Sequence, residues 1–558
     1  MSMELRLLVA ALVVLGCGDS TTATSDATTF VEGTSSTTGD DSPTGVSLSS
    51  TSVPTGGPET GGPGDTGSDT DEPPAAECFK GNIFADQDEA EATLATLAGF
   101  ECIEGSLSIT NTTLADLKVL SSLRSITGEL GLSHVEIGTL AGLEQLREIG
   151  EGLYLNRTSL TNLDPLAGLE MLGGRLVLEH NGALTTVPLS KLTSIGGEVA
   201  IGSNGLVDLA GLANVTSIGG RLSITFNASL ESLAGLAALT SIGGSLTIDR
   251  NDVLADLEGL GGLTGPIESL TITGNAGLVA VGPPSLQAVT GAVEIRKNGA
   301  FGSLAGFSAL TSIGGGLTIA GNGALVSLAG AEKLASVGAD VTITGNGELA
   351  SLAGLDGLGS IGGALAIVSN PKLGAVEGLD ALTGAASVNI EQNGALLRIG
   401  GLDGLVSVSG GVSIFFNEAL LELDGLGALA SVEFLAIKAN TSLTSLASLD
   451  ALMTAKHVDV DGSAVTDLDG LSKLTSLENL IVTDNPALVS VAALIDGGAG
   501  SLGSVTGSVL IIGNESLPTC TARKVHDALG KKPSHFCYLN KADACSDDPD
   551  ICKEGPMP

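Results

Sequence analysis

Tryptophan is absent from this chain of 558 residues, and aromatic residues make up only 2 % of it. Basic residues are scarce as well, because 24 Lys and Arg stand against 63 Asp and Glu and leave a net charge of −39. Proteins that bind nucleic acids present basic surfaces to the phosphate backbone. The charge balance therefore argues against DNA or RNA as a partner.

The motifs of several common enzyme classes are also missing. The sequence contains no Gly-x-Ser-x-Gly, no P-loop and no His-Glu-x-x-His. Two Gly-x-Gly-x-x-Gly matches, at 62–67 and 498–503, do not lie between an expected strand and an expected helix, so they do not predict a dinucleotide site. We expect a protein without catalytic residues, bound metal or cofactor.

What the chain does have is a repeat, Ile-Gly-Gly-x-Leu-x-Ile-x-x-Asn-x-x-Leu-x-x-Leu-x-Gly-Leu, which runs from about residue 106 to residue 517. Eleven steps of this repeat give a mean period of 23.5 residues, which is typical of a solenoid or array. The Asn of the repeat marks each copy, and it recurs at Asn181, Asn204, Asn227, Asn251, Asn275, Asn298, Asn322, Asn346, Asn370, Asn393, Asn417 and Asn440.

Each copy predicts one flattened coil. The Leu and Ile of a Leu-x-Ile pair such as Leu246 and Ile248 are two residues apart, so they share one face of a short strand and point inward. The later Leu residues recur about every three positions and would also fit a helix. Gly in nearly every such segment, for example Gly235, costs about 1 kcal/mol in a helix interior and favours a turn instead. Stacked coils bury the Leu side chains that one coil leaves exposed.

The Asn column predicts a buried ladder, in which each side-chain amide bonds the backbone and the Asn of the neighbouring coils. In the same register Thr112, Val135 and Thr158 precede the column, and Ser463, Asn485 and Asn514 follow it. Together with the twelve Asn residues, these positions mark eighteen successive coils, which we call rungs. They predict a mainly β fold, a parallel β-solenoid over 106–517. Asn485 and Asn514 are separated by extra residues, which predicts a protruding loop at 495–506.

The first residues are typical of an exported protein. Leu7–Leu15 is apolar but too short to span a bilayer, and Val14-Leu15-Gly16-Cys17 resembles the lipobox of bacterial lipoproteins. We expect a signal peptide at 1–16 and a lipid on Cys17 that anchors the protein to a bacterial membrane, at the outer membrane or cell surface. An ordinary secretory signal is the alternative. Residues 17–77 predict a disordered tether, since 18–77 hold eleven acidic residues, no Lys or Arg, and mostly Ser, Thr, Gly and Pro.

The other six cysteines all lie outside the repeats, in a segment at 78–105 and a segment at 518–558 that we expect to cap the two ends of the solenoid. In an exported protein an even number of cysteines predicts disulfides, formally with fifteen possible pairings. We favour Cys78–Cys102, Cys520–Cys537 and Cys545–Cys552. A zinc site formed by the last four, with His526 and His535 nearby, is the alternative.

The first cap also carries a family resemblance. Asp86 and Glu89 suggest a capping box before a helix at 90–97, and then comes Glu101-Cys102-Ile-Glu-Gly-Ser-Leu-Ser-Ile109. This pattern resembles the opening of the receptor L domain of the insulin and growth-factor receptor family, and the repeats are similar to that family and to fungal cell-wall proteins built from it. The resemblance implies a right-handed, leucine-rich-repeat-like β-solenoid with a non-enzymatic surface role. It carries no ligand identity, because this chain has many more uninterrupted rungs and no Cys-rich module.

The outward strand positions supply the candidate binding residues. Most carry Ser or Thr, but one mixed cluster contains Glu391, Phe415, Lys438, Asp459 and Asp461. Glu391, Phe415, Lys438 and Asp461 should form one column on adjacent strands, with Phe415 as a stacking surface for a short sugar chain or a peptide strand. A smaller cluster holds Tyr154, Arg157, Glu179 and His180.

We therefore expect a surface scaffold for adhesion or binding, with an extracellular protein or a cell-surface polysaccharide as its partner. A polysaccharide-active β-helix enzyme is one alternative, because such enzymes place carboxylates and a basic residue on adjacent rungs. An ice-binding surface is a weaker one, since Asp249, Glu294, Arg296 and Ala320 interrupt the Thr rows.

Overall fold

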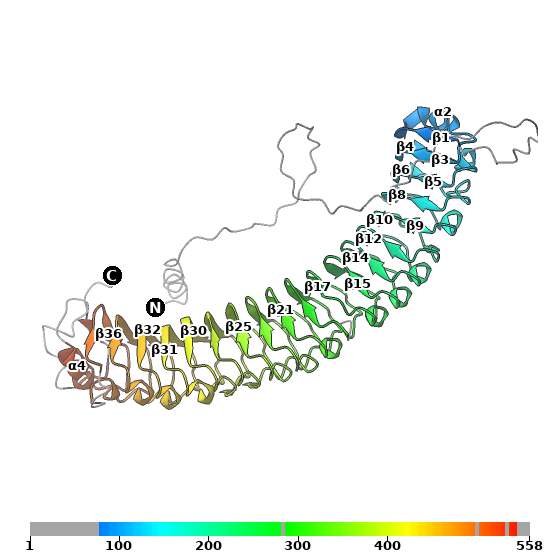
Figure 1. Ribbon diagram of the computed structural model, residues 1–558. Helices are drawn as coiled ribbons and strands as arrows, with labels where there is room; N and C mark the ends of the chain where they lie inside the picture. Colours follow the sequence, from blue (N-terminus) through cyan, green and yellow to red (C-terminus); the bar gives the residue numbers. More distant parts are fainter. Residues whose placement is uncertain (1–76, 281–284, 497–501, 530–534, 539, 544–558) are drawn as a thin grey trace, which may run out of the picture. The chain divides into compact units, whose positions relative to one another are not determined.

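The computed structural model describes residues 77–280, 285–496, 502–529, 535–538 and 540–543. These residues form a parallel β-solenoid whose strands lie side by side in coil after coil (Figure 1). The expected signal peptide, Cys17 and most of the tether lie outside the described residues. The main sheet has one strand for every predicted rung from Thr112 to Asn514. Its principal strands are β2 (Ile83–Asp86), β4 (Leu107–Thr113), β6 (Glu129–Glu136), β8 (Gly152–Thr158), β10 (Arg175–Glu179), β12 (Val199–Gly202), β14 (Leu222–Thr225), β16 (Leu246–Asp249), β17 (Leu270–Thr273), β19 (Val293–Arg296), β21 (Leu317–Ala320), β23 (Val341–Thr344), β25 (Ala364–Val368), β28 (Ser387–Glu391), β30 (Ser407–Phe415), β31 (Ser431–Lys438), β32 (Thr454–Asp461), β34 (Asn479–Thr483), β36 (Val509–Ile512) and β37 (His535–Phe536).

The inward Leu-x-Ile pairs are confirmed. In β21, Leu317 and Ile319 are buried, whereas Thr318 and Ala320 on the other face are partly exposed. Each strand pairs in parallel with the next coil, and identical repeat positions stand opposite each other, as in the pairing of Leu317 with Val341. The aliphatic core therefore continues without a break from coil to coil, which explains how an interior with so few aromatic residues is filled.

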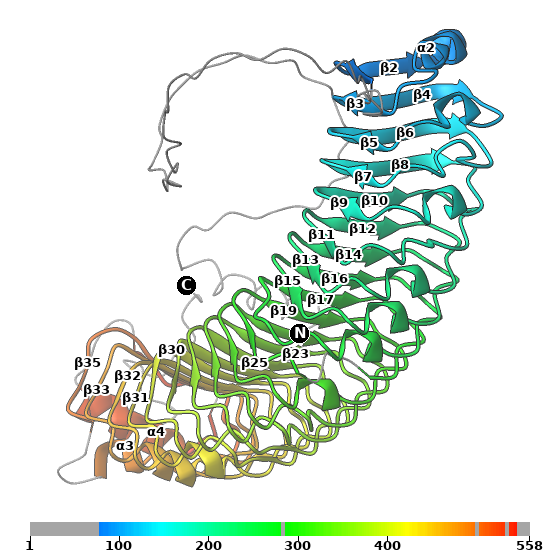
Figure 2. The ribbon, with the colours of Figure 1, turned by 45° about the vertical axis from the view of Figure 1, so that its right-hand side comes forward.

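A second set of short parallel strands runs beside the main sheet, as the neighbouring arrows in Figure 2 show. Most contain two residues, typically Ser-Ile. They are β1 (Cys78–Lys80), β3 (Cys102–Glu104), β5 (Ser125–Ile126), β7 (Glu148–Ile149), β9 (Met171–Leu172), β11 (Ser194–Ile195), β13 (Ser217–Ile218), β15 (Ser241–Ile242), β18 (Ala288–Val289), β20 (Ser312–Ile313), β22 (Ser336–Val337), β24 (Ser360–Ile361), β27 (Gly384–Ala385), β33 (Ser476–Leu477) and β35 (Ser504–Val505), with a separate pair formed by β26 (Ala375–Val376) and β29 (Arg398–Ile399).

The glycine after these strands is required by the approach of adjacent coils. A Cβ added at Gly338 would lie 2.0 Å from the carbonyl oxygen of Gly314 in the preceding coil, and the same holds for Gly362 over Gly338. Because the obstacle is backbone, no side-chain movement relieves it.

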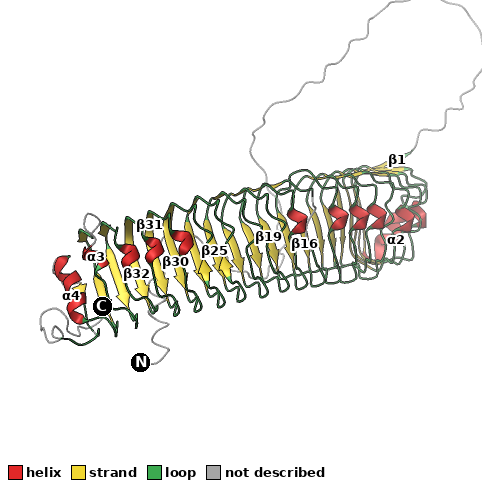
Figure 3. Ribbon diagram, turned by 90° about the horizontal axis from the view of Figure 1, so that it is seen from below, coloured by secondary structure: helices red, strands yellow, loops and turns green. Residues whose placement is uncertain are grey.

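The third side of many coils is a single turn of 3-10 helix, and these turns form a row in Figure 3. The prediction of non-helical turns was wrong here. Gly in these segments is needed for close contact between coils, since a Cβ at Gly235 would lie 1.9 Å from the carbonyl oxygen of Leu209. The 3-10 helices are η2 (Gln87–Glu89), η3 (Lys118–Leu120), η4 (Asp164–Leu166), η5 (Ala210–Leu212), η6 (Ala234–Leu236), η7 (Glu258–Leu260), η8 (Ala305–Phe307), η9 (Asp424–Leu426), η10 (Ala447–Leu449) and η11 (Asp469–Leu471).

The asparagine ladder is confirmed. All twelve Asn residues of the column are buried, with Asn204 the most exposed at 6 %. The amide nitrogen of Asn322 donates to the carbonyl oxygen of Ile295 at 2.9 Å and to Oδ1 of Asn346 at 3.3 Å. Its own Oδ1 accepts from the backbone and side-chain nitrogens of Asn298, each at 3.2 Å. Each of the twelve Asn residues is hydrogen-bonded to the ladder residue of both neighbouring coils, from Thr158 before Asn181 to Ser463 after Asn440.

The residue before each ladder position turns the chain through a left-handed backbone conformation. His134 and His180 adopt φ values of 56° and 57°, and glycine takes this place in several coils, as at Gly321 with φ of 65°. The two histidines are therefore corner residues, as their position in the repeat predicts.

Helices close the two ends. At the first end β2 adds a rung, and α2 (Ala90–Ala95) places Ala90 and Leu94 over the core. The predicted capping box is wrong, because neither Asp86 nor Glu89 makes a side-chain cap bond. Asp86 Oδ1 instead accepts from Thr110 Oγ1 at 2.9 Å in the next rung.

At the other end, α4 (Thr519–Ala528) buries Ala522 and Val525. The ladder continues one step beyond the predicted register, because Oδ1 of Asn540 accepts from the backbone nitrogen of Asn514 at 3.0 Å. The predicted loop at 495–506 begins inside α3 (Ala493–Asp496) and includes β35, and residues 497–501 of it lie outside the described part.

The Cys78–Cys102 disulfide is confirmed and joins the facing strands β1 and β3. Cys520 and Cys537 are also disulfide-bonded, which leaves no thiolate at either sulfur for zinc. Their predicted pairing stays a prediction, and Cys545 and Cys552 lie outside the described residues. Within the ranges described, no helix has the length and apolar character needed to cross a membrane.

Candidate binding face

The structure brings the four predicted column residues together on adjacent strands. Glu391 of β28 pairs with Phe415 of β30, Phe415 pairs with Lys438 of β31, and Lys438 pairs with Asp461 of β32. All four side chains occupy the outward positions of their strands and are partly exposed. Since neighbouring strands are about 4.8 Å apart, the column is about 14 Å long.

Lys438 connects the column to Asp459. Its ammonium forms an ion pair with Oδ2 of Asp459 and lies 6.0 Å from the centroid of the Phe415 ring. A cation over an aromatic face is attracted by the ring's electron density. Lys438 is therefore held between the ring and the carboxylate.

Asp459 differs from expectation because it is nearly buried. Its side chain is only 8 % exposed, although it occupies an outward strand position. Burial raises the pKa of the Asp459 carboxyl above its ordinary value, and the hydrogen bond from Lys438 opposes that rise without cancelling it. Its second oxygen, Oδ1, is buried and has no hydrogen-bond partner. Asp459 is thus a carboxyl group that is shielded from solvent and has one oxygen that accepts no hydrogen bond.

The outer residues of the column are held by short polar contacts. Asp461 Oδ1 accepts from Thr483 Oγ1 at 2.8 Å, and Glu391 Oε2 accepts from Asn389 Nδ2 at 3.4 Å. The carbonyl oxygen of the Asn389 side chain, Oδ1, is buried without a partner, like Oδ1 of Asp459. Asn389 and Asp459 occupy the same outward row, three strands apart.

Sequence reasoning missed a second row of side chains. Phe434 of β31 and His457 of β32 face each other with ring centroids 6.3 Å apart, and Nδ1 of His457 is 2.9 Å from Nδ2 of Asn479. The signal was present in the sequence. Phe434 and His457 lie directly before the inward Leu435 and Val458, and the single residues Glu433 and Lys456 replace the Gly-Gly of the repeat, so the strand continues through the corner.

The smaller predicted cluster is only partly assembled. Tyr154 lies beneath Arg175, whose guanidinium is 5.2 Å from the ring centroid and bonds both carboxylate oxygens of Glu129 at 2.8 and 3.1 Å. Burial raises the pKa of the Tyr154 phenol. Arg175 and Glu129 were not predicted.

The other members of this cluster point to separate partners. Arg157 Nη1 lies 2.9 Å from Nε2 of His134, and Glu179 accepts from Asn156 at 3.5 Å. The cluster therefore consists of separate surface contacts.

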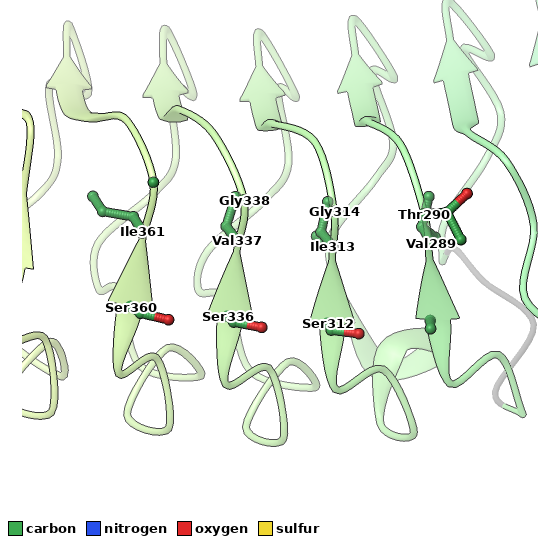
Figure 4. Close-up of a pocket in the computed structure, with 12 residues that line it drawn as sticks. Val289, Thr290, Ser312, Ile313, Gly314, Ser336, Val337, Gly338, Ser360 and Ile361 are labelled. Carbon is green, nitrogen blue, oxygen red and sulfur yellow. The ribbon is translucent and has the colours of Figure 1, made fainter.

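A shallow groove of about 580 Å³ follows the second set of strands at β18, β20, β22 and β24 (Figure 4). Ser312, Ser336 and Ser360 repeat along it and point the same way, while the Ile or Val that follows each is turned to the core. Its lining has no charged residue. The groove is the regular surface of the repeat and gives no site.

Among the residues that the structure describes, no group of three or more His, Cys, Asp or Glu side chains is arranged to hold a metal ion. No protein-family model matches this chain, and no curated protein matches it either.

Proposed function

We propose that this protein is a lipid-anchored surface scaffold that binds an extracellular protein or polysaccharide without catalysing a reaction. The observation that carries the proposal is the exact register of Glu391, Phe415, Lys438 and Asp461 on four adjacent strands. Binding energy concentrates on aromatic and long polar side chains that are held in place by their neighbours. Over most of the remaining main sheet the outward side chains are small or hydroxylic, as at Thr318 and Thr342.

The resemblance to receptor L domains supports the same role. The first disulfide, Cys78–Cys102, brackets α2, as that resemblance implies. The stacked coils form a rigid support, because the Asn ladder and the two sets of strands link each coil to the next. A rigid support lowers the entropic cost of presenting a binding surface.

A pull-down tests the binding role. Full-length protein is incubated with secreted proteins and cell-surface polysaccharide, and captured material is compared for wild type, Phe415→Ala, Lys438→Ala and Thr318→Ala. We expect the first two substitutions to weaken capture and Thr318→Ala to leave it unchanged. Circular dichroism must show that each variant is folded. Equal capture by all four proteins would mean that the column is ordinary solvated surface.

The anchor is tested separately by metabolic labelling with a fatty acid in a bacterial host. Wild type should incorporate the label and Cys17→Ala should not. An unlabelled wild type, or label that survives the substitution, would remove the anchor from the proposal and leave the binding role to the pull-down.

A further inference from the structure

The outward position at Ala436 is buried, as it also is at Val177 and Ala200 on the same sheet. Ala436 occupies an outward position between the inward residues Leu435 and Ile437, yet it is 0 % exposed. Phe434 and Lys438 precede and follow it on the same face of β31, and Asp459 is its neighbour on β32. Ala436 has no exposed surface, and the larger side chains of Phe434, Lys438 and Asp459 are its neighbours on this face. They form a continuous platform, which we call the β30–β32 platform.

Two aromatic rings belong to this platform at opposite ends of its strands. Phe415 ends β30, and Phe434 lies four residues before Lys438 on the neighbouring strand. Four residues of a strand extend about 13 Å. Both rings are partly exposed, so they offer two apolar surfaces at a separation that suits an elongated ligand.

The polar atoms between and beside the rings are mainly acceptors. Asp459 Oδ1 and Asn389 Oδ1 are buried without a donor, and the carboxylates of Glu391 and Asp461 are partly exposed next to them. The ammonium of Lys438 is already engaged by Asp459. The partly exposed carboxyl oxygens of Glu391 and Asp461 are hydrogen-bond acceptors, so a ligand that supplies hydroxyl donors is favoured here.

The geometry disfavours an extended peptide and an acidic polymer. Each strand of the platform is paired on both sides, β31 with β30 and β32, so no open edge is available for a peptide to add as a strand. The carboxylates of Glu391, Asp459 and Asp461 outnumber the single ammonium of Lys438 and repel uronate or sulfate groups.

We propose that the β30–β32 platform binds an uncharged, hydroxyl-rich glycan, with Phe415 and Phe434 stacking on sugar faces and the carboxyl groups of Glu391 and Asp461 accepting from hydroxyl groups. This inference rests on the proposed binding function and names the class of ligand. The side chain of Phe434 becomes part of the same site as the column.

The test is native gel electrophoresis of the full-length protein in gels that contain dextran, a β-glucan, mannan or galactan. Polygalacturonate serves as the polyanion and chitosan as the polycation. Phe415→Leu and Phe434→Leu keep an apolar side chain but remove the flat ring. Phe226→Leu is the matched control, because Phe226 is an exposed ring at 47 % that lies outside the platform, beside Arg250.

We expect at least one uncharged polysaccharide to retard the wild type. The association constant should fall roughly fivefold or more in each platform variant, and it should not change in Phe226→Leu. The inference is overturned if no uncharged polymer retards the protein, or if the platform variants bind like wild type. It is also overturned if chitosan alone retards the protein, because a polycation is attracted to any chain with a net charge of −39. A protein captured through Phe415 in the pull-down, without any glycan binding, would reject the glycan and keep the proposed function.

Discussion

Strands β21 and β31 bury the same kind of residues and expose different ones. Leu317 and Ile319 of β21 have their counterparts in Leu435 and Ile437 of β31, and all four are buried. On the outer face β21 carries Thr318 and Ala320, whereas β31 carries Ala436 and Lys438 at the same positions and Phe434 before them. The inward residues contact the coils on both sides and must repeat, while the outward residues have no such constraint.

The two strands also differ in length, and the cause is the corner before them. β21 contains four residues and follows Gly314-Gly315, whose backbones approach the preceding coil too closely for side chains. β31 contains eight residues, because the single residue Glu433 replaces the two glycines and the strand begins earlier, at Ser431. Loss of the glycine corner therefore lengthens the strand, and Phe434 occupies the outward position that Gly316 holds before β21. We therefore expect the inward residues to determine stability, and the outward residues of the coils without the glycine corner to determine binding.

The largest expected effect comes from two neighbouring residues of β30. Ile414→Ala should lower the free energy of unfolding by about 2–5 kcal/mol, because Ile414 is fully buried and its truncation leaves a cavity. Phe415→Ala should lower it less and should weaken ligand capture. Urea unfolding measures both values. Similar losses of stability at the two positions would contradict the division between inward and outward roles.

A smaller effect is expected at Asp459. The pKa of its carboxyl group is raised in the folded protein, whereas in the unfolded protein it has the ordinary value of about 4. At pH values between these two pKa values, the folded state binds more protons than the unfolded state. The stability contributed by this group should therefore fall as pH rises through that window. Asp459→Asn should remove this component, so the stability of wild type minus that of the variant should decrease with rising pH in urea titrations. A difference that is constant or increases would show that the attraction of Lys438 exceeds the cost of burial.

The sequence was sufficient to predict the features that recur from coil to coil. The disulfide at the first cap followed from the placement of six cysteines outside the repeats. The Asn column fixed the register of every rung, and from it followed the inward Leu and Ile residues and the pairing of Glu391, Phe415, Lys438 and Asp461 on adjacent strands. These features depend on periodicity and on strand alternation, which are local properties of the sequence.

The features that the sequence did not predict depend on contacts between coils. The 3-10 turns were missed because the propensity of Gly was considered within one coil, whereas Gly235 is required by the coil before it. Asp459 was expected at the surface because alternation gives the direction of a side chain but not its cover, which Lys438 and its neighbours supply. Phe434 and His457 were missed because they lie before the inward Leu-x-Ile pair, whereas only the outward positions within and after that pair were considered.

The buried Asn ladder is the central claim, since it sets the register from which every other position is derived. It is tested most directly by the free energies of unfolding of Asn322→Ala and Thr318→Ala in the same urea experiment. Asn322→Ala should cost about 1–3 kcal/mol, because it leaves the carbonyl of Ile295 and the backbone nitrogen of Asn298 without their buried partner, whereas Thr318→Ala should cost less than about 0.5 kcal/mol. Equal costs at the two positions would contradict the ladder and the register built on it.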